Sequence, residues 1–200
     1  MNTKSLKSLL YELESLWRNE KAPILDKLNP GLKNPEKEIY GFSGVLPNEV
    51  WELYSWKNGV NATSKDLIGN LKIFQMGIFL PLEKAIDIEK EMIGTEFGWD
   101  SNKFVLFESG GGDYYLIDGN TSANSYGMLF YHSIGSVEFE TIISQYDSLY
   151  ALFLTIYECF KRRIFTYDKG LLKIDREKYF DIGKEMNPRS DYWKLGSESK

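Results

Sequence analysis

The chain has 200 residues, of which 42% are hydrophobic and 26% are charged, proportions that are typical of one globular domain and exclude a disordered chain. Its formal net charge of −5 disfavours nucleic acid or an anionic membrane surface as the main ligand. No apolar run approaches the ~20 residues that span a bilayer, and acidic residues interrupt the first stretch, so we expect no signal peptide and a cytoplasmic protein.

Cysteine chemistry is limited by a single residue, Cys159, which excludes an internal disulfide and a metal site with several cysteine ligands. Cys159 lies in an apolar helical pattern, so we expect it to be buried and unreactive. We expect neither a metal nor another cofactor.

Leucines and one tryptophan recur at three- and four-residue steps over residues 6–17, which predicts an amphipathic helix. Its polar face alternates lysine with glutamate, so packing on the domain is favoured over binding to a membrane surface. Prolines and glycines punctuate residues 21–45, where we expect two short helical turns. One lies near residues 24–28, and Asn34 caps the other, with Pro35 at its first position.

Residues 46–59 predict a short helix with one apolar stripe. Pro47 suits the first helical position, because a backbone N–H at that position would have no partner within the helix. Asn58-Gly59 is expected to end the helix, because both residues tolerate the left-handed conformation. Trp51 points away from the stripe and is a candidate for a second contact. A polar loop follows over residues 61–70.

Short strands are predicted at residues 71–74 and 77–80, followed by a helix that starts at Pro81 and stops at Gly94. Apolar residues are expected on the inner side of this helix. The outer, solvated side is expected to carry the acidic residues Glu83, Asp87, Glu89 and Glu91.

Residues 103–108, 113–118 and 127–131 predict three antiparallel strands, because they are rich in β-branched and aromatic residues. The connection Ser109-Gly110-Gly111-Gly112 predicts a hairpin turn with positive φ or close backbone approach. It does not predict a phosphate-binding loop, because no Gly-Lys-Ser/Thr follows and the chain continues as a strand.

The last third of the chain predicts a largely helical stretch at residues 139–163, a small hairpin around residues 168–170 and a final helix from about Arg176 to before Asn187-Pro188. No repeat or linker divides the chain. The order of elements therefore predicts one α+β domain over residues 1–200, with a mostly antiparallel sheet covered by helices on one face.

Two sets of residues bear on catalysis. His132 is the only histidine, and at a strand end it favours a structural or surface role. The carboxylates Glu108, Asp113 and Asp118 flank one hairpin, and they leave open a hydrolase acting on glycan or nucleic acid. Acidic residues at strand ends are common for solubility and turn formation, so we favour a protein without enzymatic activity.

Several short motifs occur in a recognisable order: Leu28-Asn29-Pro30-Gly31; Leu46-Pro47, Leu53-Tyr54 and Asn58-Gly59; residues 79–83; and Gly111-Gly112-Asp113-Tyr114 with Asp118. This ordered set resembles the SUKH superfamily, in its bacterial branch related to the fungal Smi/Knr-type regulators of cell-wall synthesis. The resemblance covers about residues 25–165 and leaves residues 166–200 as a C-terminal extension. Trp51 departs from it, being bulkier than the polar residue usual there.

The resemblance implies a SUKH-like fold and a protein-binding domain without enzymatic activity. Bacterial members are mostly taken to be immunity proteins that bind and neutralise a cognate toxin, often a nuclease. An acidic protein suits a basic toxin, because opposite potentials steer association. The expected partner is thus a toxin effector domain, and neither nucleic acid nor a membrane. A scaffold or regulator of cell-wall or glucan synthesis is the alternative.

We expect the partner to bind around the glycine hairpin and the polar loop that follows Gly59. The candidate partner-binding residues are Trp51, Trp99, Glu108, Asp113, Tyr115 and Asp118. The other motif residues are expected to determine the fold: Asn29, Pro30, Gly31, Leu46, Pro47, Tyr54, Asn58, Gly59, Gly111 and Gly112.

Overall fold

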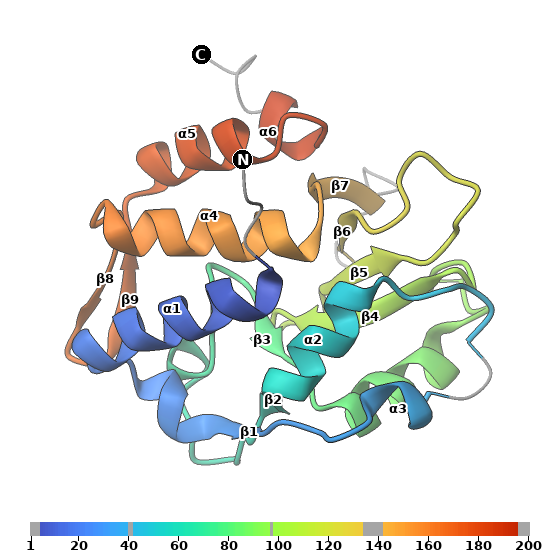
Figure 1. The fold of residues 1–200 in the computed structure, drawn as a ribbon, viewed down its shortest axis with the longest axis horizontal. Coiled ribbons are helices and arrows are strands. Elements are labelled where there is room, and N and C mark those ends of the chain that lie inside the picture. Colours follow the sequence, from blue (N-terminus) through green and yellow to red (C-terminus); the bar gives the residue numbers. More distant parts are fainter. Residues whose placement is uncertain (1–4, 40–41, 97, 134–141, 196–200) are drawn as a thin grey trace.

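A computed structural model describes residues 5–39, 42–96, 98–133 and 142–195. The main sheet is antiparallel and has five strands in the order β3-β4-β5-β6-β7 (Figure 1). These strands are β3 (Ile78–Phe79), β4 (Lys103–Glu108), β5 (Tyr114–Asp118), β6 (Leu129–His132) and β7 (Ile142–Tyr146). Two small antiparallel sheets pair β1 (Leu28–Pro30) with β2 (Lys57–Val60) and β8 (Phe165–Asp168) with β9 (Leu171–Ile174).

The helices are α1 (Leu6–Asn19), α2 (Asn48–Trp56), α3 (Leu82–Met92), α4 (Leu149–Lys161), α5 (Arg176–Met186) and α6 (Tyr192–Leu195). Short 3-10 turns occupy Pro23–Lys27, Pro35–Lys37 and Ile68–Asn70. The predicted α+β fold with an antiparallel sheet is confirmed. Within the described residues, none of the helices is long and apolar enough to cross a bilayer.

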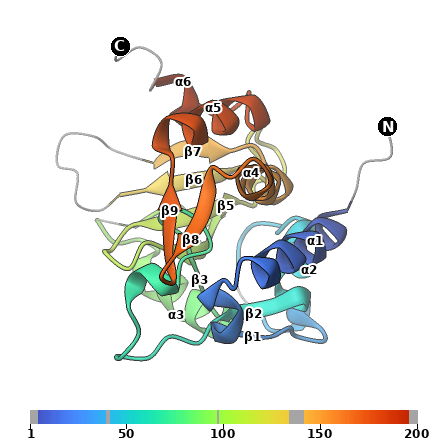
Figure 2. The same cartoon turned by 90° about the vertical axis from the view of Figure 1, so that its left-hand side faces the viewer.

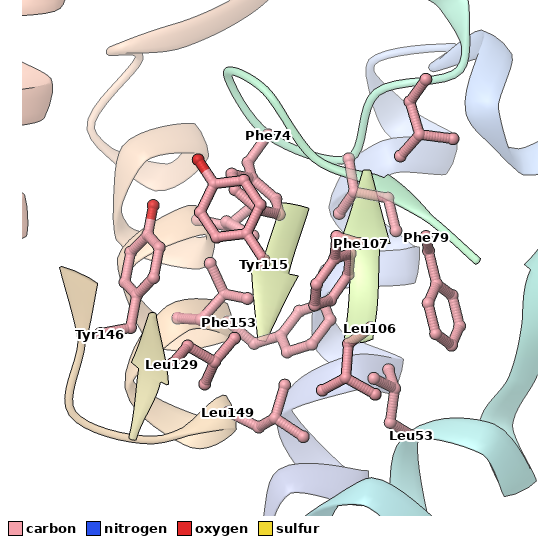
Figure 3. Close-up of a cluster of buried hydrophobic side chains, with 14 of the residues drawn as sticks. Leu53, Phe74, Phe79, Leu106, Phe107, Tyr115, Leu129, Tyr146, Leu149 and Phe153 are labelled. Carbon is pink, nitrogen blue, oxygen red and sulfur yellow. The ribbon is translucent and has the colours of Figure 1, made fainter. Parts of the chain in front are cut away.

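The core lies between one face of the sheet and the layer formed by α1, α2 and α4 (Figure 2). Phe107 of β4 lies 6.5 Å from Phe153 of α4, and Tyr115 of β5 lies 5.0 Å from Phe74, measured between ring centroids. Leu53 reaches the same cluster from α2 (Figure 3). Complete burial of side chains of this size contributes about 1.5–3 kcal/mol each, which explains why the aromatic content of the chain is high.

The opposite face of the sheet carries a second, smaller layer. Tyr114 points to this face and Tyr115 to the core face, because neighbouring side chains on a strand point to opposite faces of the sheet. Trp99 packs against Tyr114 and His132 with ring-centroid distances of 5.4 and 5.7 Å. Helix α3 joins this layer through Glu89, whose carboxylate accepts the indole N–H of Trp99.

Two segments differ from the sequence-based prediction. Residues 142–146 form strand β7 on the edge of the sheet, where a helix was predicted, and residues 139–141 lie outside the described residues. Helix α4 starts only after Ser148, whose hydroxyl accepts the backbone N–H of Ala151. Residues 71–74 form no strand, and Phe74 makes an isolated bridge with Gly77 across the turn at residues 75–76.

Helix α2 also begins and ends differently. Pro47 is the N-cap, one residue before the predicted position, and its ψ of 150° is not helical. The helix stops at Trp56 because Lys57, the first residue of β2, is already extended and pairs with Pro30 of β1. Gly59 has a φ of +70° within β2, so the left-handed residue shapes the strand and does not end the helix.

The C-terminal extension is part of the core. The hydroxyls of Tyr146 in β7 and Tyr179 in α5 are 2.6 Å apart. The Ser190 hydroxyl donates to the carbonyl of Ser144 at 2.7 Å, and the indole N–H of Trp193 donates to the carbonyl of Gln145. This segment therefore covers the edge strand β7, which would otherwise present unpaired backbone groups.

Candidate functional site

The motif residues around Asn58 join three segments of the chain. The Oδ1 of Asn58 accepts the backbone N–H of Leu82 at 2.8 Å, and its Nδ2 donates to Glu83 at 3.2 Å. The Nδ2 of Asn29 donates to the carbonyl of Asn58 at 2.9 Å. Asn58 thus satisfies an unpaired N–H at the start of α3, as an N-cap side chain does. These contacts give Asn29 and Asn58 structural roles.

Gly59 lies where two backbones approach closely. A Cβ on this residue would lie 2.1 Å from the backbone nitrogen of Pro81, and its φ is +70°. Any larger residue would therefore collide with the chain at the start of α3 and adopt a strained conformation. Tyr54 reinforces this junction, because its hydroxyl donates to the carbonyl of Leu80 at 3.3 Å.

The glycine hairpin between β4 and β5 has the conformation that the sequence predicts. Gly110 and Gly112 have φ values of +78° and +99°. The hydroxyl oxygen of Ser109 accepts the backbone N–H groups of Gly111 and Asp113 at 3.0 and 3.2 Å. The turn is thus fixed by its own side chain, and β5 continues directly from it.

Three segments that are distant in the sequence follow one another at the surface here, because the hairpin approaches Ile68 and the neighbouring Gly69 approaches Leu171. A Cβ built on Gly110 would lie 3.2 Å from Cγ2 of Ile68, and one built on Gly69 would lie 3.4 Å from Cδ2 of Leu171. Leu67, Ile68 and Leu171 are 65%, 49% and 41% exposed. We call Leu67, Ile68, Leu171 and residues 110–112 the hairpin surface. Apolar side chains gathered in this way are typical of an interaction site, whereas single exposed ones need no explanation.

The loop that carries Leu67 and Ile68 is held by an ion pair. Asp66 lies 2.6 Å from the Nζ of Lys27 and accepts the backbone N–H of Thr63 at 2.8 Å. The hydrogen bond from Lys27, with those from Thr63, lowers the pKa of Asp66 to about 2. These contacts connect the loop to the segment that carries Lys27.

Three of the predicted partner-binding residues are buried, which corrects their assignment. Trp99, Tyr115 and Asp118 are only 5%, 1% and 3% exposed. Trp99 and Tyr115 pack on opposite faces of the sheet. Asp118 accepts the backbone N–H of Asn120 at 2.8 Å and the hydroxyl of Ser125 at 2.6 Å, so it fixes the turn after β5. A partner docking on the surface would not contact these side chains.

The other three predicted residues are half-buried at the surface. Glu108 and Asp113 flank the glycine hairpin, and Trp51 lies elsewhere. Glu108 forms an ion pair of 2.5 Å with Lys84 of α3. Asp113 accepts the hydroxyl of Ser133 at 2.9 Å, beside the hairpin surface. Trp51 lines a separate groove of about 270 Å³, together with Glu36, Ile39, Phe42, Gly44, Val45 and Leu46.

The three carboxylates considered for catalysis do not form one cluster. Glu108 and Asp113 flank the same glycine turn, whereas Asp118 closes the far end of β5, about 16 Å from Asp113 at 3.3 Å per residue. Asp118 is therefore farther from Asp113 than the ~10 Å that separates paired carboxylates in glycosidases. Glu108 forms an ion pair with Lys84. Among the described residues, no group of histidine, cysteine, aspartate and glutamate is arranged to hold a metal ion.

Glu89 is a buried acid that the sequence analysis placed on the solvated side of its helix, which was wrong. It is 7% exposed, and its carboxylate accepts the indole N–H of Trp99 and, at 3.4 Å, the backbone N–H of Val105. Burial raises the pKa of Glu89 to about 7, although both hydrogen bonds oppose the shift. The signal was available, because Glu89 follows Leu82 by seven residues and Ala85 by four, which places all three on one side of the helix.

Cys159 is buried, and burial raises the pKa of its thiol to about 12, as expected for a packing residue.

No family model matches the chain, and no curated protein aligns with it as a relative.

Proposed function

We propose that the protein is a SUKH-type binding domain, without enzymatic activity, that neutralises a bacterial toxin by covering its effector domain. The ordered motifs of residues 25–165 support the family, and their side chains have structural roles that suit a shared scaffold. The observation that carries the proposal is the hairpin surface, where Leu67 and Ile68 stand exposed on a loop held by the Lys27–Asp66 ion pair.

The hairpin surface has the composition of a protein interface. Its apolar side chains gain about 25 cal/mol for each Å² that a partner covers, and the glycines at its centre let a partner backbone come close. The net charge of −5 would speed association with a basic effector domain. Nucleases that act on nucleic acid carry such basic surfaces.

Co-expression with the effector domain of a toxin whose gene adjoins the gene of this chain tests the proposal. We expect the protein to restore growth and to co-purify with the effector domain as a stoichiometric complex. Ile68→Asp should abolish both effects, because it places a charge in the covered apolar surface. Tyr11→Asp is the matched control, since Tyr11 is 53% exposed on α1 outside the hairpin surface.

Continued killing with no complex would refute the proposal. Recovery of cell-wall synthesis enzymes with the purified protein, without any protection, would instead favour the scaffold or regulator.

A further inference from the structure

A small apolar pocket opens beside α3, on the face of the sheet away from the main core. Its volume is about 80 Å³, and a single water-sized group needs about 10–15 Å³. The pocket therefore has room for a chain of about five atoms. We call it the Glu89 pocket, and its lining residues are Ile39, Phe42, Ile86, Glu89, Lys90, Ile93 and Phe104.

Glu89, one of the residues that line this pocket, carries a carboxylate that lacks a cation. Glu89 accepts hydrogen bonds from Trp99 at 3.2 and 3.3 Å and from Val105 at 3.4 Å, whereas an ionised carboxylate has about four acceptor sites. Within the described residues, no lysine or arginine forms an ion pair with Glu89. A buried charge without a counter-charge is costly, so a cation entering the pocket would relieve that cost.

Lys90 also lines the pocket, but it does not supply the missing charge. Its Nζ lies 3.5 Å from Asp87, and its side chain is 70% exposed. The ammonium group thus stays at the surface, one helical residue beyond Glu89. In this arrangement the carboxylate of Glu89 is left without a cation from Lys90.

We infer that the Glu89 pocket receives a lysine or arginine side chain of a protein partner. Such a side chain combines an apolar stem, which suits Ile86, Ile93 and Phe104, with a charged head that suits the carboxylate. This inference goes beyond the proposed function, because it concerns a different surface. The hairpin surface lies at the Glu108 end of β4, and the Glu89 pocket lies toward the Phe104 end.

The surface beside the pocket offers a protein partner further apolar contacts. The groove that holds Trp51 shares Ile39 and Phe42 with the Glu89 pocket. Val45, on the same groove, is 58% exposed. A basic anchor with apolar neighbours would therefore match both the pocket and its margin, and the acidic balance of the chain favours its approach.

Titration of the full chain with n-butylammonium chloride at pH 8 tests the inference. The chain has five tryptophans, whose indole N–H signals can be followed by NMR, and Trp99→Phe assigns the signal of Trp99. We expect a saturable shift of that signal. n-Butanol, which has the same stem without the charge, should bind at least tenfold more weakly. Nα-acetyl-lysine N-methylamide should bind at least as tightly as n-butylammonium.

Glu89→Gln should weaken n-butylammonium binding at least tenfold, and Glu91→Gln, on the exposed side of the same helix, should leave it within twofold. Ile93→Trp, at the exposed rim of the pocket, should also weaken binding, and it keeps the test decisive if Glu89→Gln does not fold. No saturable shift, equal affinity in Glu89→Gln or Ile93→Trp, or equal binding of n-butanol would overturn the inference. Exclusion of the lysine derivative would overturn the assignment to a protein side chain.

Discussion

The indole N–H of Trp99 donates to both carboxylate oxygens of Glu89, at 3.3 and 3.2 Å, from a loop that follows α3 by a few residues. Trp99 in turn packs on Tyr114 of β5. The pair therefore fastens α3 to the face of the sheet opposite the main core. Because the carboxylate is buried, its protonation becomes part of the stability of the fold.

Stability should fall between about pH 4.5 and 7 because of Glu89. Its pKa is about 7 in the folded chain, against an ordinary value of 4.5. In this range the folded chain holds a proton that the unfolded chain releases, so the free energy of unfolding decreases as pH rises, by about 3 kcal/mol. In Glu89→Gln this loss should be absent. Urea unfolding at pH 4.5 and 8 measures it.

The comparison depends on the difference between the two proteins, because other groups also titrate. The charge of Asp100 also raises the pKa of Glu89, and Asp100 is present in both proteins. Glu91→Gln should follow the wild-type profile. Parallel profiles for Glu89→Gln and the wild type would show that Glu89 is not the responsible group.

Gly59→Ala should destabilise the fold more than Gly94→Ala. Both glycines have positive φ, which costs an alanine about 1–2 kcal/mol. Only at Gly59 would the new Cβ also meet the backbone, with Pro81 N at 2.1 Å, whereas nothing lies within 4 Å at Gly94. The difference in free energy of unfolding between the two variants isolates the cost of the collision. Equal losses would mean that the backbones at Pro81 can separate freely.

Asn58→Ala should cost about 0.5–2 kcal/mol, the range for loss of an N-cap side chain. It removes the bond that Asn58 accepts from the N–H of Leu82, and it leaves that donor unpaired at the start of α3. Asn61→Ala, an exposed position three residues on, should change stability by less than about 0.5 kcal/mol. Urea unfolding at pH 8 compares the two variants. Equal losses in the free energy of unfolding would show that the Asn58 side chain does not stabilise the start of α3.

Trp193→Ala should cost about 3–5 kcal/mol, in the range for truncation of a large buried aromatic side chain. Trp193 is 1% exposed, and it packs on Tyr179 and Tyr146 while covering β7. Tyr192→Ala, at a half-buried position beside it, should cost less. Thermal unfolding measures both, and a negligible effect of Trp193→Ala would mean that the C-terminal extension is dispensable for the fold.

Regular patterns in the sequence predicted most of the elements. The leucine spacing of α1, the hydrophobic runs of β4, β5 and β6, and the turn residues between them are local signals, and local interactions decide these elements. Strand β7 was missed because its residues 142–146 adjoin the apolar face of α4 in the sequence. The Asp147-Ser148 pair before Leu149 was the available boundary signal, since Ser148 is the N-cap of α4.

The burial of individual polar and aromatic residues could not be predicted from such local patterns. Trp99 and Asp118 have side chains that are common at interfaces and turns, and only the tertiary contacts decide that both are inside. Glu89 shows the same error, because the sequence analysis gave its charge more weight than its position on the inner side of α3. The hairpin surface was predicted in part: the polar loop and the glycine turn were named, whereas Leu171 joins them only through the fold.

The most direct test of the proposed function uses the effector domain of a toxin whose gene adjoins the gene of this chain. Isothermal titration calorimetry measures the affinity of the purified chain for that purified domain. We predict a stoichiometric complex and at least a hundredfold loss of affinity for the double variant Leu67→Asp, Ile68→Asp, with the Tyr11→Asp control unchanged. The double variant should unfold at nearly the same urea concentration as the wild type, because both side chains are exposed. Absence of binding by the wild type, or equal affinity of the double variant, would contradict the account.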